Sequence, residues 1–144
     1  YKFSINGINC LGSSGQNIND MKKYSRIETG IELIERTLRW RHLAPTAPDT
    51  IECFPSLGLD PFIFTESPHI YFTGNQEKFD SQLVRGTDGQ ITRLISVPEF
   101  SASSTLVLCE VNSLECRTIN FDVSELISDD IEGKFSRLQT ATQQ

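Results

Sequence analysis

The sequence has few of the residues that build most metal and redox sites. It contains 4 Cys and 2 His among 144 residues, and neither a Cys-x-x-Cys nor a His-x-x-x-His pattern occurs. Structural zinc sites usually draw on such closely spaced ligands, so we expect none within this chain. The cysteines are also too sparse for the disulfide framework of a small secreted protein, which favours a reducing compartment, the cytosol or the nucleus.

Long apolar runs and an excess of positive charge are missing as well. The longest apolar run has four residues, Leu106 to Cys109, against the roughly 20 that a membrane-spanning helix needs. The chain carries 13 Lys and Arg against 19 Asp and Glu, a formal net charge of −6. Because clustered Lys and Arg grip phosphate backbones, we predict neither membrane insertion nor a surface that holds nucleic acid directly.

Apolar residues are nevertheless plentiful enough for the core of one domain. Leu, Ile, Val and Phe make up 41 of the 144 residues, more than a disordered chain contains. The sequence opens with Tyr1 rather than Met and lacks a signal-peptide pattern, and its first segment already reads as a strand within a domain. We therefore interpret the chain as part of a longer polypeptide.

The first 41 residues predict a hairpin followed by two helices. Residues 1–12 form the hairpin, which turns at Asn6-Gly7, a dipeptide suited to a type I′ turn. A short helix is expected from about residue 17. The second helix covers residues 30–41, where apolar residues recur at helical spacing and Thr29 is a suitable N-cap.

Prolines dominate the next part of the chain. Five of them lie within residues 42–68 and predict a long irregular loop. A short buried strand is then expected at residues 69–73, followed by a turn at Gly74-Asn75. The apolar residues of the loop are candidates for core or interface, and core packing is expected for most of them: Phe54, Leu57, Leu59, Phe62 and Phe64.

Two further hairpins are predicted, over about residues 82–97 and 105–121. The second turns at Asn112-Ser113, and a two-residue loop there places Cys109 opposite Cys116. Opposed cysteines form a disulfide in an oxidising compartment and remain small apolar residues in a reducing one. Free thiols are the expected state.

Side chains that catalyse reactions are few and scattered. His42 and His69 stand 27 positions apart without nearby paired carboxylates, and packing or capping is the expected role of each. Asp49, Asp60 and Asp80 lie in turn-like contexts, where aspartate commonly bonds its own backbone. By its residues alone, the chain is predicted to be a mixed α/β piece without a visible active site.

A family resemblance goes further than these residues. Four segments, in this order, resemble the small, or B, subunits of eukaryotic replicative DNA polymerases of the delta type: LGSSGQNINDM (11–21), TLRWRHLAPTAPDT (37–50), DPFIFTESPHIYFTGNQEKF (60–79) and LISVPEFSASSTLVLCEV (94–111). The resemblance covers roughly residues 1–121, and HLAPTAPDT followed by PHIYFTGNQ is its specific combination.

The resemblance implies an α/β fold. Residues 1–127 would be the C-terminal half of a calcineurin-like phosphoesterase domain, a two-sheet sandwich flanked by helices, and residues 128–144 a frayed acidic and polar tail. An oligonucleotide/oligosaccharide-binding-fold domain and the first half of the phosphoesterase would precede Tyr1. Because half of each sheet would then be unpaired, we expect residues 1–144 alone not to fold cooperatively.

Active relatives in the phosphoesterase superfamily carry histidine metal ligands at three positions of this half. By resemblance these correspond to Ser14, which precedes Gly15, and to Asn75 and Glu77. Hydroxyl and amide groups are poor ligands for the metals that imidazole binds well, and a two-metal site must hold both ions close together. We therefore expect a degenerate site without catalytic residues, bound metal or cofactor.

The resemblance also implies a function. The parent protein would be a non-catalytic nuclear accessory subunit that scaffolds a polymerase for DNA replication and repair synthesis. Its partners would be the C-terminal metal-binding domain of the catalytic subunit, a third accessory subunit and the preceding part of the same polypeptide, with DNA contacted only indirectly. The alternative is a metal-dependent phosphodiesterase or nuclease of the same fold, with ligands mainly from the missing N-terminal half. Which residues contact which partner, and whether a second polymerase is served, stay open.

Overall fold

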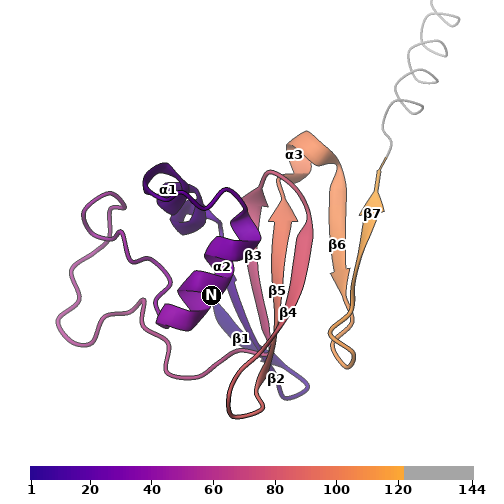
Figure 1. Cartoon of the computed structure of the whole chain (residues 1–144), viewed down its shortest axis with the longest axis horizontal. Helices are drawn as coiled ribbons and strands as arrows, with labels where there is room; N and C mark the ends of the chain where they lie inside the picture. The colour runs from indigo at the N-terminus through magenta and orange to yellow at the C-terminus, as the bar shows by residue number, and fades with distance from the viewer. Residues whose placement is uncertain (122–144) are drawn as a thin grey trace, which may run out of the picture.

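A five-stranded mixed sheet occupies the middle of the molecule, as the computed structural model of residues 1–121 shows (Figure 1). The three inner strands run parallel, and each outer strand is antiparallel to its neighbour. In spatial order the strands are β1 (Lys2–Ile5), β2 (Ile8–Ser13), β3 (Ile70–Gln76), β5 (Ile91–Pro98) and β4 (Asp80–Arg85). The expected α/β class is confirmed, whereas the tail predicted at residues 128–144 lies outside the described residues.

Local sequence accounts for both hairpins of this sheet. Asn6 and Gly7 have positive φ angles of 49° and 80°, as a type I′ turn requires, and Ile5 pairs with Ile8 across it. Strands β4 and β5 form the second predicted hairpin, around residues 86–89. Both hairpin predictions are confirmed.

Two helices cover one face of the sheet (Figure 1). They are α1 (Gln16–Tyr24) and α2 (Gly30–Trp40), and the N-cap prediction is confirmed, since Thr29 Oγ1 accepts from the backbone N–H of Glu32 at 3.4 Å. Alternate residues of the inner strands pack against the helices because successive side chains of a strand point to opposite faces. The resulting core is almost fully buried: Leu11, Ile18, Leu33, Ile34, Tyr71 and Leu94 are at most 2% exposed.

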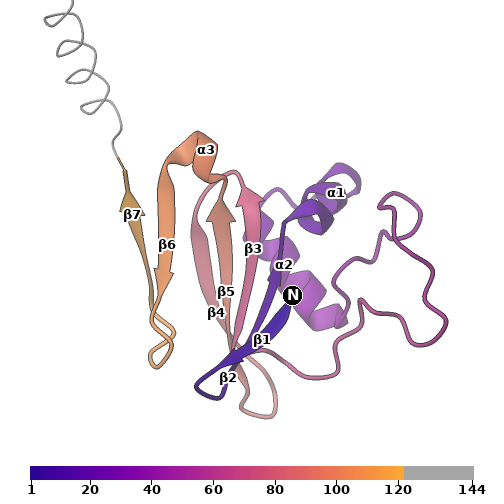
Figure 2. The same cartoon turned by 180° about the vertical axis from the view of Figure 1, so that it is seen from behind.

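A short second sheet lies on the opposite face (Figure 2). It consists of β6 (Thr105–Cys109) and β7 (Cys116–Asn120), and the four-residue helix α3 (Phe100–Ser103) precedes it. Val107 and Cys116 pack towards Ile70 and Ile95 of the large sheet, but β7 is exposed at nearly every residue. This second face is therefore less completely covered than the helix face.

Two turns differ from the sequence predictions. Strand β3 continues to Gln76, and Gly74-Asn75 is a bulge rather than a terminal turn. At this bulge Asn75 contacts Ser14 in the loop that follows β2. In the last hairpin Cys109 does face Cys116, as predicted, but the loop is four residues wide and Leu114 adopts a positive φ of 58°. All four thiols are free.

The long loop between α2 and β3 corrects a further expectation. Phe64 is buried at 2% exposure and Phe62 is half-buried, but Phe54, Leu57 and Leu59 are 95%, 107% and 92% exposed. Core packing is thus wrong for most of the set, because the middle of the loop reaches away from the sheet and helices (Figures 1 and 2). Within residues 1–121, no helix is long and apolar enough to span a bilayer.

Candidate functional site

The carboxyl ends of the neighbouring parallel strands β2 and β3 meet at one edge of the sheet, where open α/β sheets generally bind their ligands. Ser14 follows β2 and Asn75 lies in the bulge of β3, and the structure brings these two expected positions together. The Asn75 side chain Nδ2 donates to the backbone oxygen of Ser14 at 3.0 Å. Asn75 itself holds a left-handed φ of 51°, so this contact supports a backbone conformation that most residues avoid.

Gly15 allows this close approach. Its φ is +94°, and a Cβ atom added there would lie 2.0 Å from the backbone oxygen of Gly74 and 2.7 Å from Nε2 of Gln76. Both the conformation and the space therefore require glycine at the turn into α1.

Gln76 fills the space between the end of β3 and the helices. It is 3% exposed, and its Nε2 donates to the oxygen of Gly74 at 3.0 Å and to Oδ1 of Asn19 at 3.3 Å. Its Oε1 is buried beside Gly30 and has no hydrogen-bond partner among the described residues. A neutral amide thus occupies the centre of the strand-end junction.

Glu77 does not join the other two expected positions. It is exposed and borders a hollow shared with Lys22, Lys78 and Asp80, whereas Ser14 borders a different hollow. Within residues 1–121, no three His, Cys, Asp or Glu side chains are placed so that they could hold a metal ion. The residues present here therefore do not fit the two-metal centre of active phosphoesterases, which needs several strong ligands around closely spaced ions.

Short polar side chains near the same edge bond one another instead. Ser13 Oγ lies 3.1 Å from Oδ1 of Asn17 and 3.3 Å from Oγ1 of Thr73. Nδ2 of Asn17 donates to the backbone oxygen of Leu43. These bonds connect β2, β3, α1 and the start of the long loop, so the polar character of the SSGQN segment serves the fold.

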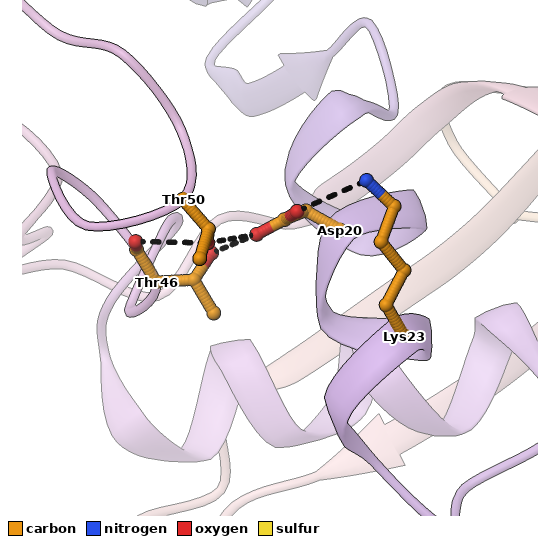
Figure 3. A network of polar contacts seen from close by, with 4 residues as sticks. All are labelled: Asp20, Lys23, Thr46 and Thr50. Carbon is orange, nitrogen blue, oxygen red and sulfur yellow. Dashed lines mark hydrogen bonds and ion pairs between the residues drawn. The ribbon is translucent and has the colours of Figure 1, made fainter.

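Asp20 extends this network to the HLAPTAPDT segment (Figure 3). The aspartate is 5% exposed, and its Oδ2 accepts from Oγ1 of Thr46 at 2.7 Å and from Oγ1 of Thr50 at 2.5 Å, while Lys23 Nζ lies 3.3 Å from Oδ1. The hydroxyl of Thr46, followed by that of Thr50, lowers the pKa of Asp20 despite the opposing effect of burial. Asp20 therefore stays ionised at neutral pH.

Sequence reasoning missed Asp20, although a signal was present. The residue follows Asn17 by three positions and neighbours Ile18 and Met21, so it shares the buried side of α1. A carboxylate on such a side needs donors from elsewhere in the chain. We call the hydrogen-bonded set at this edge the polar seam, and it comprises Ser13, Ser14, Asn17, Asn19, Asp20, Thr46, Thr50, Thr73, Asn75 and Gln76.

Four of the remaining candidates have a hydrogen-bond partner outside the polar seam. Asn9 N–H donates to Nδ1 of His69 at 3.0 Å, and Nε2 of His42 lies 2.9 Å from Oδ2 of Asp60. The backbone N–H of Phe62, and then His42, lowers the pKa of Asp60. These contacts agree with the packing, capping and turn roles that the sequence indicates. Asp80 likewise accepts the backbone N–H of Ser81 at 2.8 Å.

Comparison with known proteins gives a consistent result. A family model that describes the B subunits of DNA polymerases alpha and epsilon matches residues 1–81. The DNA polymerase delta small subunit of Arabidopsis thaliana is 47% identical over 121 residues, which cover 84% of this chain and 28% of that protein. DNA polymerase delta subunit 2 of Drosophila melanogaster is 42% identical over 78% of this chain and 26% of its own length. The DNA polymerase delta small subunit of Saccharomyces cerevisiae is 36% identical over 85% of this chain and 30% of its own length. The chain thus spans less than a third of these relatives.

Proposed function

This chain belongs to the family of DNA polymerase alpha and epsilon B subunits, and from that premise we propose that it is part of a non-catalytic accessory subunit of a delta-type replicative polymerase. The parent protein would act in the nucleus during DNA replication and repair synthesis. The relatives' names support the polymerase assembly. The observation that supports the absence of catalysis is the polar seam, in which Asn75 donates a hydrogen bond to the backbone oxygen of Ser14, so that two of the three positions that the resemblance aligns with metal ligands bond to each other.

The fold of the parent domain is part of the same proposal. Residues 1–127 form the C-terminal half of a calcineurin-like phosphoesterase sandwich. Two observations support it: a second sheet begins on the face opposite the helices, and that face is only partly covered by β6 and β7. The rest of the parent polypeptide would complete both sheets, because exposed strand edges are otherwise sites of uncontrolled pairing.

The scaffolding role assigns partners to the parent protein. It would hold the C-terminal metal-binding domain of the catalytic subunit and a third accessory subunit, and it would contact DNA only through them. A net charge of −6 supports this indirect role, because an acidic surface repels the phosphate backbone.

The test is made on the full-length parent protein, alone and co-expressed with its polymerase catalytic subunit. We expect a stoichiometric complex, and we expect the parent protein alone to hold no stoichiometric Mn, Fe or Zn and to leave a phosphodiester substrate intact. Measuring metal on the lone protein separates its content from metal bound by the catalytic subunit. Two tightly bound transition-metal ions together with hydrolysis would contradict the proposal and establish the phosphodiesterase alternative.

A further inference from the structure

The middle of the long loop carries three large apolar side chains that touch almost nothing. Phe54, Leu57 and Leu59 are 95%, 107% and 92% exposed, and we call residues 54–59 the apolar tip. The tip stands away from the sheet and helices in both views (Figures 1 and 2). Burying such side chains in an interface removes apolar surface from water and therefore favours association.

Both stems of this loop are fastened to the body. On the N-terminal side, Thr46 and Thr50 donate to Asp20. On the C-terminal side, the backbone N–H of Leu43 donates to the oxygen of Phe62 at 2.9 Å, and that of Phe64 donates to Arg41 at 3.2 Å. The tip is therefore presented from a fixed base, an arrangement that suits recognition because less loop entropy is lost on binding.

The stretch of sequence that contains the tip carries charge of one sign. No Lys or Arg occurs in residues 42–77, although the whole chain has 13, and the stretch contains five carboxylates, those of Asp49, Glu52, Asp60, Glu66 and Glu77. Complementary potentials guide one protein surface to another, and an acidic surface disfavours nucleic acid. The matching surface is a protein groove that is apolar at its centre and bordered by Lys or Arg.

We propose that the apolar tip docks into such a groove on the polymerase catalytic subunit. This inference rests on the proposed accessory function, in which the catalytic subunit is a chain that the small subunit holds. Phe54, Leu57 and Leu59 fill the apolar centre of the groove, while Asp49 and Glu52 face its basic border. Buried aromatic and aliphatic anchors ringed by polar contacts are the usual arrangement of an interface centre.

The experiment uses the full-length parent protein and the purified catalytic subunit of the same polymerase. A variant with Phe54→Ser, Leu57→Ser and Leu59→Ser is compared with Tyr24→Ser, which alters another exposed apolar side chain, 66% exposed on α1. We expect the tip variant to bind at least about tenfold more weakly and the control to stay within about twofold of wild type. The thermal midpoint of the parent protein alone should remain within about 1 °C for both.

Charge reversal provides an independent measurement. The variant Asp49→Lys with Glu52→Lys should slow association with the catalytic subunit, and the difference from wild type should shrink at high salt, because screening weakens charge steering. Lys78→Glu, outside the cation-free stretch, serves as its control. Equal association rates at low salt for wild type and for the variant with Asp49→Lys and Glu52→Lys would contradict the basic border of the groove.

Each other outcome is decisive as well. If wild type binds the catalytic subunit and the tip variant binds equally well, the docking proposal is overturned and the accessory function stands. If the tip variant lowers the thermal midpoint of the parent protein alone, the tip packs against the parent's own polypeptide and the proposal is overturned. If wild type itself does not bind the catalytic subunit, the accessory function and the docking proposal both fail.

Discussion

The polar seam and the apolar tip share the loop between α2 and β3 but use their side chains in opposite ways. In the seam, polar groups bond one another across β2, β3, α1 and the loop, and four of them are buried: Asn17, Asp20, Thr73 and Gln76. In the tip, large apolar groups face solvent. Two of the three positions that the resemblance aligns with metal ligands, Ser14 and Asn75, thus hydrogen-bond to each other within the fold, and the large exposed apolar side chains of the loop lie elsewhere.

The largest contrast is expected between two glycine substitutions. Gly15→Ala should destabilise the full-length protein by about 3–5 kcal/mol, because it combines left-handed backbone strain with a clash against the oxygen of Gly74. Gly58→Ala in the tip should change stability by less than about 0.5 kcal/mol, since a Cβ there meets nothing within 4 Å. Urea denaturation of both variants measures the difference. Equal losses would mean that the tip is packed in the intact protein.

A smaller contrast is expected between two aspartates. Asp20→Ala removes the acceptor of two threonine hydroxyls, and the thermal midpoint should fall by several degrees. Asp49→Ala, near the tip, should leave the midpoint within about 1 °C. Asp20→Asn retains one acceptor oxygen, so its thermal midpoint should lie between those of Asp20→Ala and Asp49→Ala. If Asp20→Ala melts like wild type, the network is not stabilising.

The smallest expected effect is the change in the contribution of Asp20 to stability at acidic pH. The hydroxyls of Thr46 and Thr50 lower the pKa of Asp20 from its ordinary 3.8, so on acidification the unfolded chain takes up this proton before the folded chain does. The stabilisation by this carboxylate is therefore fully present above about pH 4 and is lost as the pH falls through the lowered native value. The midpoint difference between wild type and Asp20→Ala should be constant from about pH 5 to 7 and should narrow below about pH 4. A difference that widens in acid would contradict this sign.

Features set by neighbours in sequence could be predicted. Asn6-Gly7 determines its turn because both residues tolerate positive φ angles. Thr29 caps α2 by accepting a hydrogen bond from Glu32, three residues further along the chain. The pairing of Cys109 with Cys116 was also predictable, because a symmetric count from the turn fixes the register even though the loop proved wider.

Features set by distant contacts could not be predicted in the same way. The bulge at Gly74-Asn75 depends on Ser14, 61 residues earlier. The bonds to Asp20 come from threonines 26 and 30 residues away. Likewise, the apolar composition of residues 51–64 does not distinguish Phe64, which meets the core, from Phe54, which does not. Composition indicates the capacity for burial, whereas only the path of the chain decides where burial occurs.

The bonds from Asp20 to Thr46 and Thr50 also bear on how quickly the chain can fold. Strands β2 and β3 are parallel neighbours whose paired residues, such as Cys10 and Ile70, stand 60 positions apart. Bringing such distant segments together is slow, because the entropy of closing the loop is lost before the strands can pair. If Thr46 and Thr50 bond to α1 first, the length of chain that must still be closed to pair β2 with β3 is nearly halved. The entropic cost of closing it then falls by about 0.5 kcal/mol. The carboxylate of Asp20, which holds the loop in the folded protein, would then also form an early contact that precedes pairing of the parallel strands.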